Sequence, residues 1–542
     1  MERVSSRMSD LKLPPELRES FRRELELLNS MGLMNEDAGE IETGLSNLSL
    51  AEEGAKLVVY GPLPEAFYVV NCPFVWSEYV STEEIEDHMT EMLSELSDQE
   101  WRTFCFQIYA AFLASRSGKL SEAFKHLENC EELLSKKAED EFFKGIMEGL
   151  THCTQAVRAH LHFLNGDAEM ADEIISGVAP LKRLGNPAKA ALIALNAEVL
   201  GKFGLLSKRM AVKLLESAIK LDPDECGSRR GAWYYSLGKL HGQLRRIKHR
   251  AGMPSKEELR LLERAVKINP FAVSLATLAD SYREASTSGK FGNEVQITDK
   301  MCGHLNSEAK KLYIKALELD SQTYSTLRRC GNGLMKLPAP HKDIPLAKDC
   351  LEKAGSLNPQ SSAVYQSLGT LEEKHFKNLE GALKYFQLSY KNGNVVAACF
   401  MIQVRMKMDK NYNPIDDIDG FIKDQVALNR PELNAKLLIL KGEYLFFLRN
   451  DFLGASKFWK EAITLSPNSE NITNHVTRLL QGRWAETPYL KYVAGRYVLN
   501  VYECLKCEIR KALVNPKYSD EDKVYLRDLL KSCEDGNAAT GQ

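Results

Sequence analysis

Three segments of the chain carry the same spaced set: a small residue, a bulky apolar one four positions on, a small one three further, and proline five beyond. On a helix the first three lie on one face. Small residues there let a second helix approach closely, the bulky residue fills the groove, and proline ends the helix. This is the pattern of the second helix of a tetratricopeptide repeat. The three sets are Ala211/Leu215/Ala218/Pro223, Ala347/Leu351/Ala354/Pro359 and Ala455/Trp459/Ala462/Pro467.

Incomplete copies of the set occur in "ELRLLERAVKINP", "AKKLYIKALELDS" and "ALKYFQLSY", and almost every other segment has the period of an amphipathic helix. The ends of successive copies are 47, 51 and 38 residues apart, from Pro223 to Pro270, Ser321 and Pro359. A regular array repeats every ~34 residues, so several connections carry insertions. We therefore predict an all-α fold, an irregular tetratricopeptide-repeat superhelix (α-solenoid) divided into sub-domains.

The repeats divide the chain into four regions. Residues 1–66 are an N-terminal extension with one predicted helix in "PPELRESFRRELELLNSMGL". Three tetratricopeptide-repeat sub-domains follow: an N-terminal one at 67–224, a central one at 225–392 and a C-terminal one at 393–542. The turn-rich stretch "KMDKNYNPIDDIDG" supports the boundary between the last two.

The charge balance gives no bulk attraction to nucleic acid, because the 542 residues carry a formal net charge of -3. The positive charge of any anion site must therefore be gathered in one place. No run of ~18 apolar residues and no signal-peptide core occurs, so we predict a cytoplasmic protein without membrane contact. The twelve cysteines mostly fall in apolar helical patterns, which indicates buried reduced thiols.

Sequence signatures of catalysis and metal binding are missing. The chain has no phosphate-binding glycine loop, no HExxH and no G-x-S-x-G. The Cys504/Cys507 pair lacks two further ligands nearby, so no metal site is predicted. We predict a protein that is not an enzyme and that presents the inner surface of its solenoid to a ligand.

Two basic residues are placed for that surface. Lys239 directly follows the Leu237-Gly238 pair of a first helix, and Arg328 has a comparable inward placement in "TYSTLRRCGNG". An arginine fork and a lysine point charge in one groove are suited to phosphate. The alternative is that each pairs with an acidic neighbour on the next helix.

The densest basic run of the chain follows Lys239. We expect its four cations to lie at the end of the first helix and in the lengthened connection after it, as an electropositive rim that steers an anion toward the groove. A solvated loop without a ligand is the alternative. The four residues are Arg245, Arg246, Lys248 and Arg250.

From Cys72 to Asn468 the sequence resembles the interferon-induced proteins with tetratricopeptide repeats, the IFIT family. The resemblance rests on the opening "CPFVWSEYVSTEEIEDHM", the first repeat "AAFLASRSGKLSEAFKHLENCEELL", the segment "SQTYSTLRR" and the later repeat "KGEYLFFLRNDFLGASKFWKEAITLSP", in this order. It implies binding of single-stranded RNA with a 5′-triphosphate or cap in a basic central tunnel, and a role in innate antiviral defence.

The resemblance also implies roles for individual residues. Glu84 corresponds to an acidic residue that holds the triphosphate through a metal ion such as Mg²⁺ or through water, and no other cofactor is implied. Lys202 and Lys239 correspond to phosphate-binding positions, and Tyr324 and Arg328 to a pair at the triphosphate. Glu198 stands where the family has the tryptophan that stacks on a cap base, and a carboxylate there repels phosphate.

Two functions follow as hypotheses. The first is a non-enzymatic RNA-binding protein that holds a 5′-phosphorylated single-stranded end. The second is a protein-interaction scaffold that has kept the fold and lost the RNA pocket, with a peptide or a second copy of itself as partner. The apolar segment "YLFFLRNDF" is compatible with such a partner, but it also has the pattern of a buried core.

Overall fold

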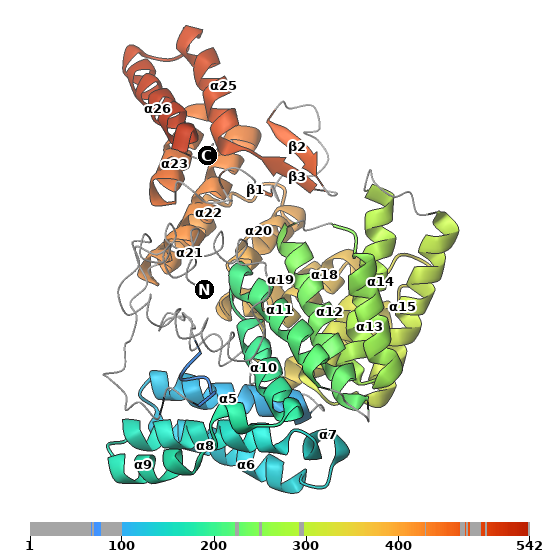
Figure 1. Ribbon diagram of the computed structural model, residues 1–542. Coiled ribbons are helices and arrows are strands. Elements are labelled where there is room, and N and C mark those ends of the chain that lie inside the picture. Colours follow the sequence, from blue (N-terminus) through green and yellow to red (C-terminus); the bar gives the residue numbers. More distant parts are fainter. Residues whose placement is uncertain are drawn as a thin grey trace. The chain divides into compact units, whose positions relative to one another are not determined.

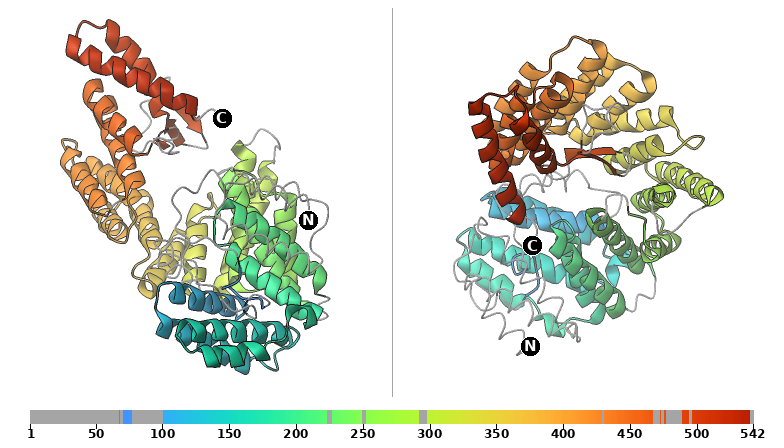
Figure 2. Two further views of the ribbon diagram at one scale, coloured as in Figure 1. Left: turned by 60° about the vertical axis from the view of Figure 1, so that its left-hand side comes forward. Right: turned by 90° about the horizontal axis from the view of Figure 1, so that it is seen from above.

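The computed structural model describes residues 67, 70–76, 100–222, 227–248, 252–291, 298–428, 430–466, 472, 475–476, 489–493 and 496–539. The predicted extension 1–66, Glu84 and Arg250 lie outside these residues, as does the side chain of Lys248. Packing divides the chain into two units, 1–343 and 344–542. Each unit is a series of helices that follow one another in sequence order in Figures 1 and 2.

Unit 1 consists of antiparallel helix pairs, among them α5 with α6, α10 with α11, α12 with α13 and α14 with α15. Its helices are α5 (Glu100–Arg116), α6 (Leu120–Lys136), α7 (Glu141–Lys144), α8 (Met147–Leu164), α9 (Ala168–Gly177), η2 (Leu181–Arg183), α10 (Asn186–Leu200), α11 (Leu205–Leu221), α12 (Ser228–Lys248), α13 (Lys256–Ile268), α14 (Ala272–Phe291), α15 (Asp299–Leu319) and α16 (Tyr324–Lys336).

Unit 2 continues with the pairs α18 with α19, α22 with α23 and α25 with α26. Two of its helices end in a π-helical turn, η3 and η4. Its elements are α17 (Ile344–Leu357), α18 (Ser362–Leu371), η3 (Glu372–Phe376), α19 (Leu379–Lys391), α20 (Val396–Met408), α21 (Ile415–Ala427), α22 (Pro431–Glu443), η4 (Tyr444–Leu448), α23 (Phe452–Leu465), β1 (His475–Val476), β2 (Leu490–Val493), β3 (Arg496–Leu499), α25 (Val501–Val514) and α26 (Asp520–Ala539).

The helix pairs confirm the predicted all-α tetratricopeptide-repeat solenoid. One small antiparallel sheet, in the order β1-β3-β2, interrupts the helices of unit 2 and was not predicted. The predicted boundaries at 224 and 392 are not where packing divides the chain, since one continuous core includes buried residues from Phe67 to Leu278. The three predicted sub-domains therefore stay a prediction.

The irregular repeat length has a physical basis in the helices themselves. The helices α12, α14 and α15 are 21, 20 and 21 residues long, well above the mean of ~12 for globular proteins. Part of the additional sequence therefore extends helices, although we expected it in the connections between them.

The repeat signature marks the closest contacts between helices. Its small and bulky residues on α11, α17 and α23 are fully buried. A Cβ atom added to Gly442 of α22 would lie 2.3 Å from Nε1 of Trp459 on α23, and one added to Gly369 of α18 would lie 2.6 Å from Phe386 on α19. Glycine on one helix thus admits the bulky residue of the next. The apolar segment around Phe447 and Phe452 is also buried, so it belongs to the core.

The segment "NCPFVW" is anchored on α8 by its backbone and its rings. The backbone N–H of Asn71 donates to Nε2 of His152 at 3.0 Å, and Trp76 Nε1 donates to Oδ1 of Asn71 at 2.7 Å. The ring of Phe74 stacks on His160, with centroids 4.7 Å apart. Burial lowers the pKa of His160 to about 4, so this histidine is a neutral core residue at pH 7.

The close contact at Gly442 predicts that alanine destabilises the fold at this position but not at a glycine with open space around it. We expect Gly442→Ala to lower the free energy of unfolding of unit 2 by about 2 kcal/mol or more, because the new methyl group overlaps the Trp459 ring. The control is Gly420→Ala on α21, where no atom lies within 4 Å of the added Cβ. It should stabilise by up to ~1 kcal/mol through helix propensity. Urea unfolding measures both, and equal effects would contradict the packing described.

Candidate functional site

Lys202 and Lys239 line one small pocket in unit 1. Lys202 lies in the turn that ends α10, where its backbone N–H donates to the carbonyl of Val199 at 2.9 Å. Lys239 is on α12, and both side chains face the same pocket. The free volume admits about one water molecule. The pocket thus brings together two of the residues assigned to phosphate, in a space too small for a base.

A carboxylate shares this pocket with the two lysines. Glu198 lines its wall and accepts a hydrogen bond from the hydroxyl of Ser236 on α12. With two lysines and one glutamate, the pocket has a formal charge of +1. A carboxylate at this position supplies no aromatic ring on which a cap base could stack, so the absence of cap stacking stays a prediction.

The ring of Phe106 on α5 connects Lys202 to a second cation. Nζ of Lys202 lies 4.7 Å from the ring centroid, and Cζ of Arg102 lies 5.2 Å from the same centroid. Arg102 also approaches the ring of Tyr235 on α12, at 5.9 Å. Such contacts hold cations against aromatic faces. Arg102 of α5 therefore also packs against α12.

Three cations act on the hydroxyl of Tyr235, which is a buried residue. Burial alone would raise the pKa of Tyr235. The positive charges of Arg102, Lys239 and Arg329 outweigh this effect, so the pKa lies below its ordinary value. Thr277 approaches the hydroxyl without reaching hydrogen-bonding geometry, so no described residue bonds it. Positive charges on α5, α12 and α16 thus all act on the hydroxyl of Tyr235.

Tyr324 and Arg328 lie together in the first turns of α16, with Cζ of Arg328 5.7 Å from the ring centroid of Tyr324. Nε of Arg328 is buried and has no hydrogen-bond partner among the described residues. The next residue, Arg329, points elsewhere because successive helical side chains diverge by ~100°. Arg329 donates a hydrogen bond to Asp280 at 3.2 Å, and its positive charge lowers the pKa of Tyr235.

The structure places two arginines of the predicted electropositive rim at the expected end of α12, but both form ion pairs. Arg245 and Arg246 lie in the last turns of α12, as expected. Arg245, however, donates to Glu258 at 2.9 Å, to Glu284 at 2.6 Å and to the carbonyl of Gly252 at 2.7 Å. Its side chain is only 11% exposed, so it belongs to a buried ion-pair network. Arg246 also donates to Glu284, at 3.1 Å, and is 36% exposed.

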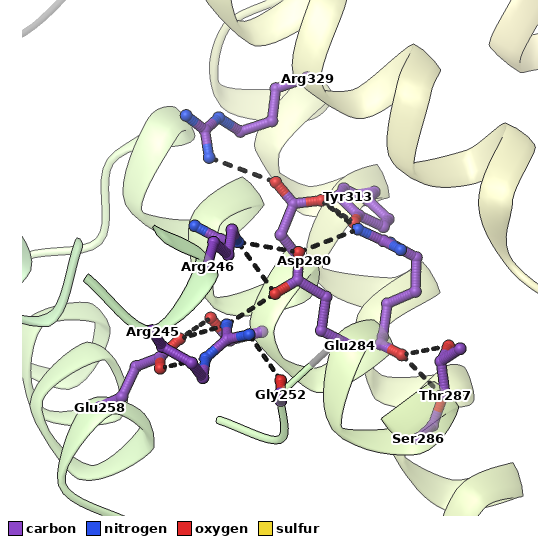
Figure 3. Close-up of polar contacts among 12 residues, drawn as sticks. Arg245, Arg246, Gly252, Glu258, Asp280, Glu284, Ser286, Thr287, Tyr313 and Arg329 are labelled. Atoms are coloured by element: carbon purple, nitrogen blue, oxygen red, sulfur yellow. Dashed lines mark hydrogen bonds and ion pairs between the residues drawn. The ribbon is translucent and has the colours of Figure 1, made fainter. Parts of the chain in front are cut away.

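Asp280 on α14 is the centre of the adjoining network in Figure 3, where α12, α14, α15 and α16 meet. It accepts hydrogen bonds from the hydroxyl of Tyr313 at 2.7 Å, from Arg329 at 3.2 Å and from Arg283 at 3.4 Å. Burial alone would raise the pKa of Asp280. The positive charges of Arg283 and Arg329 outweigh this effect, so the pKa lies below its ordinary value. Asp280 therefore fixes Arg329 beside the cations around Tyr235.

The structure brings together some of the residues predicted from the sequence and adds others. Lys202 and Lys239 share a pocket, and Tyr324 contacts Arg328. The sequence did not identify the other residues of the site, which are Arg102, Phe106, Tyr235, Asp280 and Arg329. A signal for one of them exists, since Arg102 is a lone charge in the otherwise apolar "WRTFCFQIYAAF".

Within the described part of the chain, no three histidine, cysteine or acidic side chains are placed to hold a metal ion, and no helix is long and apolar enough to cross a membrane. The cysteines described are free thiols, buried except for Cys507, which lies half-exposed. Their burial agrees with the prediction from the apolar helical pattern.

Known structures share this fold at low sequence identity. The human IFIT1 dimer with PPP-AAAA is similar with a TM-score of 0.53 and 14% identity, over 88% of this chain and 99% of that chain. The human IFIT1 dimer with m7Gppp-AAAA gives 0.54 and 14%, over 87% and 97%. No family model matches the sequence, and no curated protein is similar to it. The likeness establishes the fold.

The Asp280 network predicts a pH-dependent stability. Because its folded-state pKa is depressed, Asp280 stabilises the fold above its unfolded pKa of ~3.9, and this contribution is lost as pH falls through the folded value. We expect Asp280→Asn to cost about 3–5 kcal/mol at pH 7 and less at pH 3. Urea unfolding at both pH values measures the difference from wild type.

Glu257→Gln is the matched control, since Glu257 forms an exposed pair with Arg260. Its unfolding midpoint should stay close to that of the wild type at both pH values. A loss for Asp280→Asn that is as large at pH 3 as at pH 7 would contradict the assigned charge interaction.

Proposed function

We propose that unit 1 binds the phosphorylated 5′ end of single-stranded RNA at the cations gathered around Tyr235. The observation that carries the proposal is that the charges of Arg102, Lys239 and Arg329, which come from three different helices, all lower the pKa of the buried Tyr235, and that Arg102 lies 5.9 Å from its ring centroid. Lys202 shares a pocket with Lys239 and adds a further positive charge. In a chain of net charge -3 such a gathering indicates a local anion site.

A phosphorylated end suits this group better than a single carboxylate. Lysine forms short charge-assisted hydrogen bonds to phosphate oxygens as a point charge, and the positive charges of Arg102 and Arg329 add an attraction that grows with the number of phosphates. Tyr324, in contact with Arg328, supplies a ring on which a base stacks. Stacking on exposed rings requires unpaired bases, which favours a single strand over a duplex.

The proposal concerns uncapped ends. Glu198 and the small volume of the lysine pocket leave no place for a stacked cap base beside Lys202 and Lys239. The resemblance to the IFIT family implies a metal ion or water between Glu84 and the triphosphate. Glu84 lies outside the described residues, and no step of the proposal depends on that ion.

The structural neighbours are compatible with this assignment. Human IFIT1 is similar in fold and is a complex with PPP-AAAA in one structure and with m7Gppp-AAAA in another. A role in innate antiviral defence and a location in the cytoplasm are part of the proposal and rest on the family resemblance alone.

A protein-interaction scaffold is the second candidate. The observation that favours it is the balance of charge beside the site, where Glu258, Asp280 and Glu284 hold Arg245, Arg246, Arg283 and Arg329 in ion pairs. Copurification from lysate with and without ribonuclease separates the two candidates. Partners that all remain after nuclease treatment would favour the scaffold.

The direct test compares three oligonucleotides of one sequence, with a 5′-triphosphate, a 5′-monophosphate or a 5′-hydroxyl. We expect binding to follow the charge of the end. Lys239→Ala should weaken triphosphate binding by roughly 10- to 100-fold, the equivalent of one charge-assisted contact. The slope of log affinity against log salt should also fall by about 0.7 for each lost contact with a single strand.

The control is Lys267→Ala, which removes an exposed lysine from the last turn of α13. The variant should bind RNA like the wild type, because Lys267 lies on the second helix of its repeat and is not among the residues of the proposed site. If the wild type binds none of the three oligonucleotides measurably, the proposed function is wrong.

A further inference from the structure

Arg102 is a buried cation at the back of the proposed site. Its side chain belongs to the second residue after the start of α5 at Glu100, and the residue is 2% exposed. The guanidinium lies against two rings, with Cζ 5.2 Å from the centroid of Phe106 and 5.9 Å from that of Tyr235. This burial leaves almost no surface of Arg102 for direct contact with a ligand.

Each of the two rings is related to one of the pocket lysines. The ring of Phe106 also contacts Lys202, whose Nζ lies 4.7 Å from the ring centroid. Tyr235 precedes Lys239 by four residues on α12, which places both on one helix face. Arg102 therefore contacts two rings, of which one is shared with Lys202 and the other lies on the helix face of Lys239.

We infer that Arg102 is a specificity-determining residue that makes the site prefer a 5′ end with several phosphates over an end with one. The inference rests on the proposed function and adds to it the basis on which ligands are distinguished. Arg102 acts at a distance, across Phe106 and Tyr235, while Lys202 and Lys239 line the pocket itself.

The physical reason is that a Coulomb energy scales with the charge of the ligand. A charge fixed in a buried position is screened less by salt than an exposed one, and its interaction grows in proportion to the opposite charge. A 5′-triphosphate carries about twice the charge of a monophosphate. Loss of a distant positive charge should therefore reduce the logarithm of affinity about twice as much for the triphosphate.

A purely structural role for Arg102 predicts a different result. If Arg102 only held Phe106 and Lys202 in place, its loss would misplace one contact that every phosphorylated end makes. Monophosphate and triphosphate ends would then lose affinity by a similar factor. The ratio of the two losses thus separates an electrostatic role from a positioning role.

The test uses the full chain with Arg102→Met, which keeps an unbranched apolar side chain between the two rings. We expect affinity to fall roughly 3- to 10-fold for the 5′-monophosphate and by about the square of that factor for the 5′-triphosphate. The 5′-hydroxyl oligonucleotide should bind as it does to the wild type. Arg102→Lys keeps the charge and should preserve the wild-type ratio between ends.

Arg116→Met is the matched control, because Arg116 is on the same helix and also lies over a ring, 5.9 Å from the centroid of Phe112. It is fourteen residues further on, or ~21 Å along the helix. Its loss should leave all three affinities unchanged.

Tyr235 provides a readout that does not depend on a variant of Arg102. The charge of Arg102 helps to lower the pKa of Tyr235, so an anion bound nearby should raise it. The difference in ultraviolet absorbance between wild type and Tyr235→Phe reports this titration. Inorganic triphosphate should raise the pKa of Tyr235 more than inorganic phosphate does.

The outcomes distinguish the inference from the proposed function. Equal losses for the two phosphorylated ends in Arg102→Met, loss of the preference in Arg102→Lys, or an unchanged Tyr235 titration would each overturn the role of Arg102. If the wild type itself binds the 5′-triphosphate no better than the 5′-hydroxyl, the proposed function fails first.

Discussion

Close contact between helices at small residues is the constraint on which the rest of this molecule depends. Where glycine or alanine on one helix faces Leu, Phe, Tyr or Trp on the next, the two backbones approach until the bulky side chain fills the groove, as Trp459 does beside Gly442. Repetition of this contact sets the helices in series. Arg102, Tyr235, Lys239 and Arg329 come from three helices that this packing holds together, so the site depends on the repeat geometry.

Ion pairs beside the site in unit 1 partly balance its positive charge, and this balance has consequences for binding. Asp280, Glu258 and Glu284 hold four arginines in fixed positions. Such carboxylates reduce the net attraction for an anion, but they orient the guanidinium groups and prevent them from repelling one another. Glu198 acts in the same way between Lys202 and Lys239. A site of this kind selects for the position and number of negative charges more than for charge alone.

The sequence predicted the fold well and the site only in part, for physical reasons. The spacing of Ala211, Leu215 and Ala218 is a property of one helix, and the buried faces of α11, α17 and α23 follow from it directly. The same local geometry predicts that Lys239 faces inward, and the structure shows that it lines a small pocket. The partners of Arg245 on α13 and α14, by contrast, depend on how separate helices pack. Arg328 and Arg329 differ by one helical position, and only the packed structure decides which of them faces Asp280 and Tyr235.

The central claim is that a phosphorylated RNA end lies at the cations around Tyr235. Photocrosslinking of a 5′-triphosphate oligonucleotide with 4-thiouridine as its first nucleotide, followed by mass spectrometry of the crosslinked peptides, locates that end directly. We expect the adducts in the first turns of α16, at 323–329, because Tyr324 offers the ring on which the first base stacks, and we expect inorganic triphosphate to suppress them. Adducts confined to unit 2, or adducts that persist in excess triphosphate, would contradict the account.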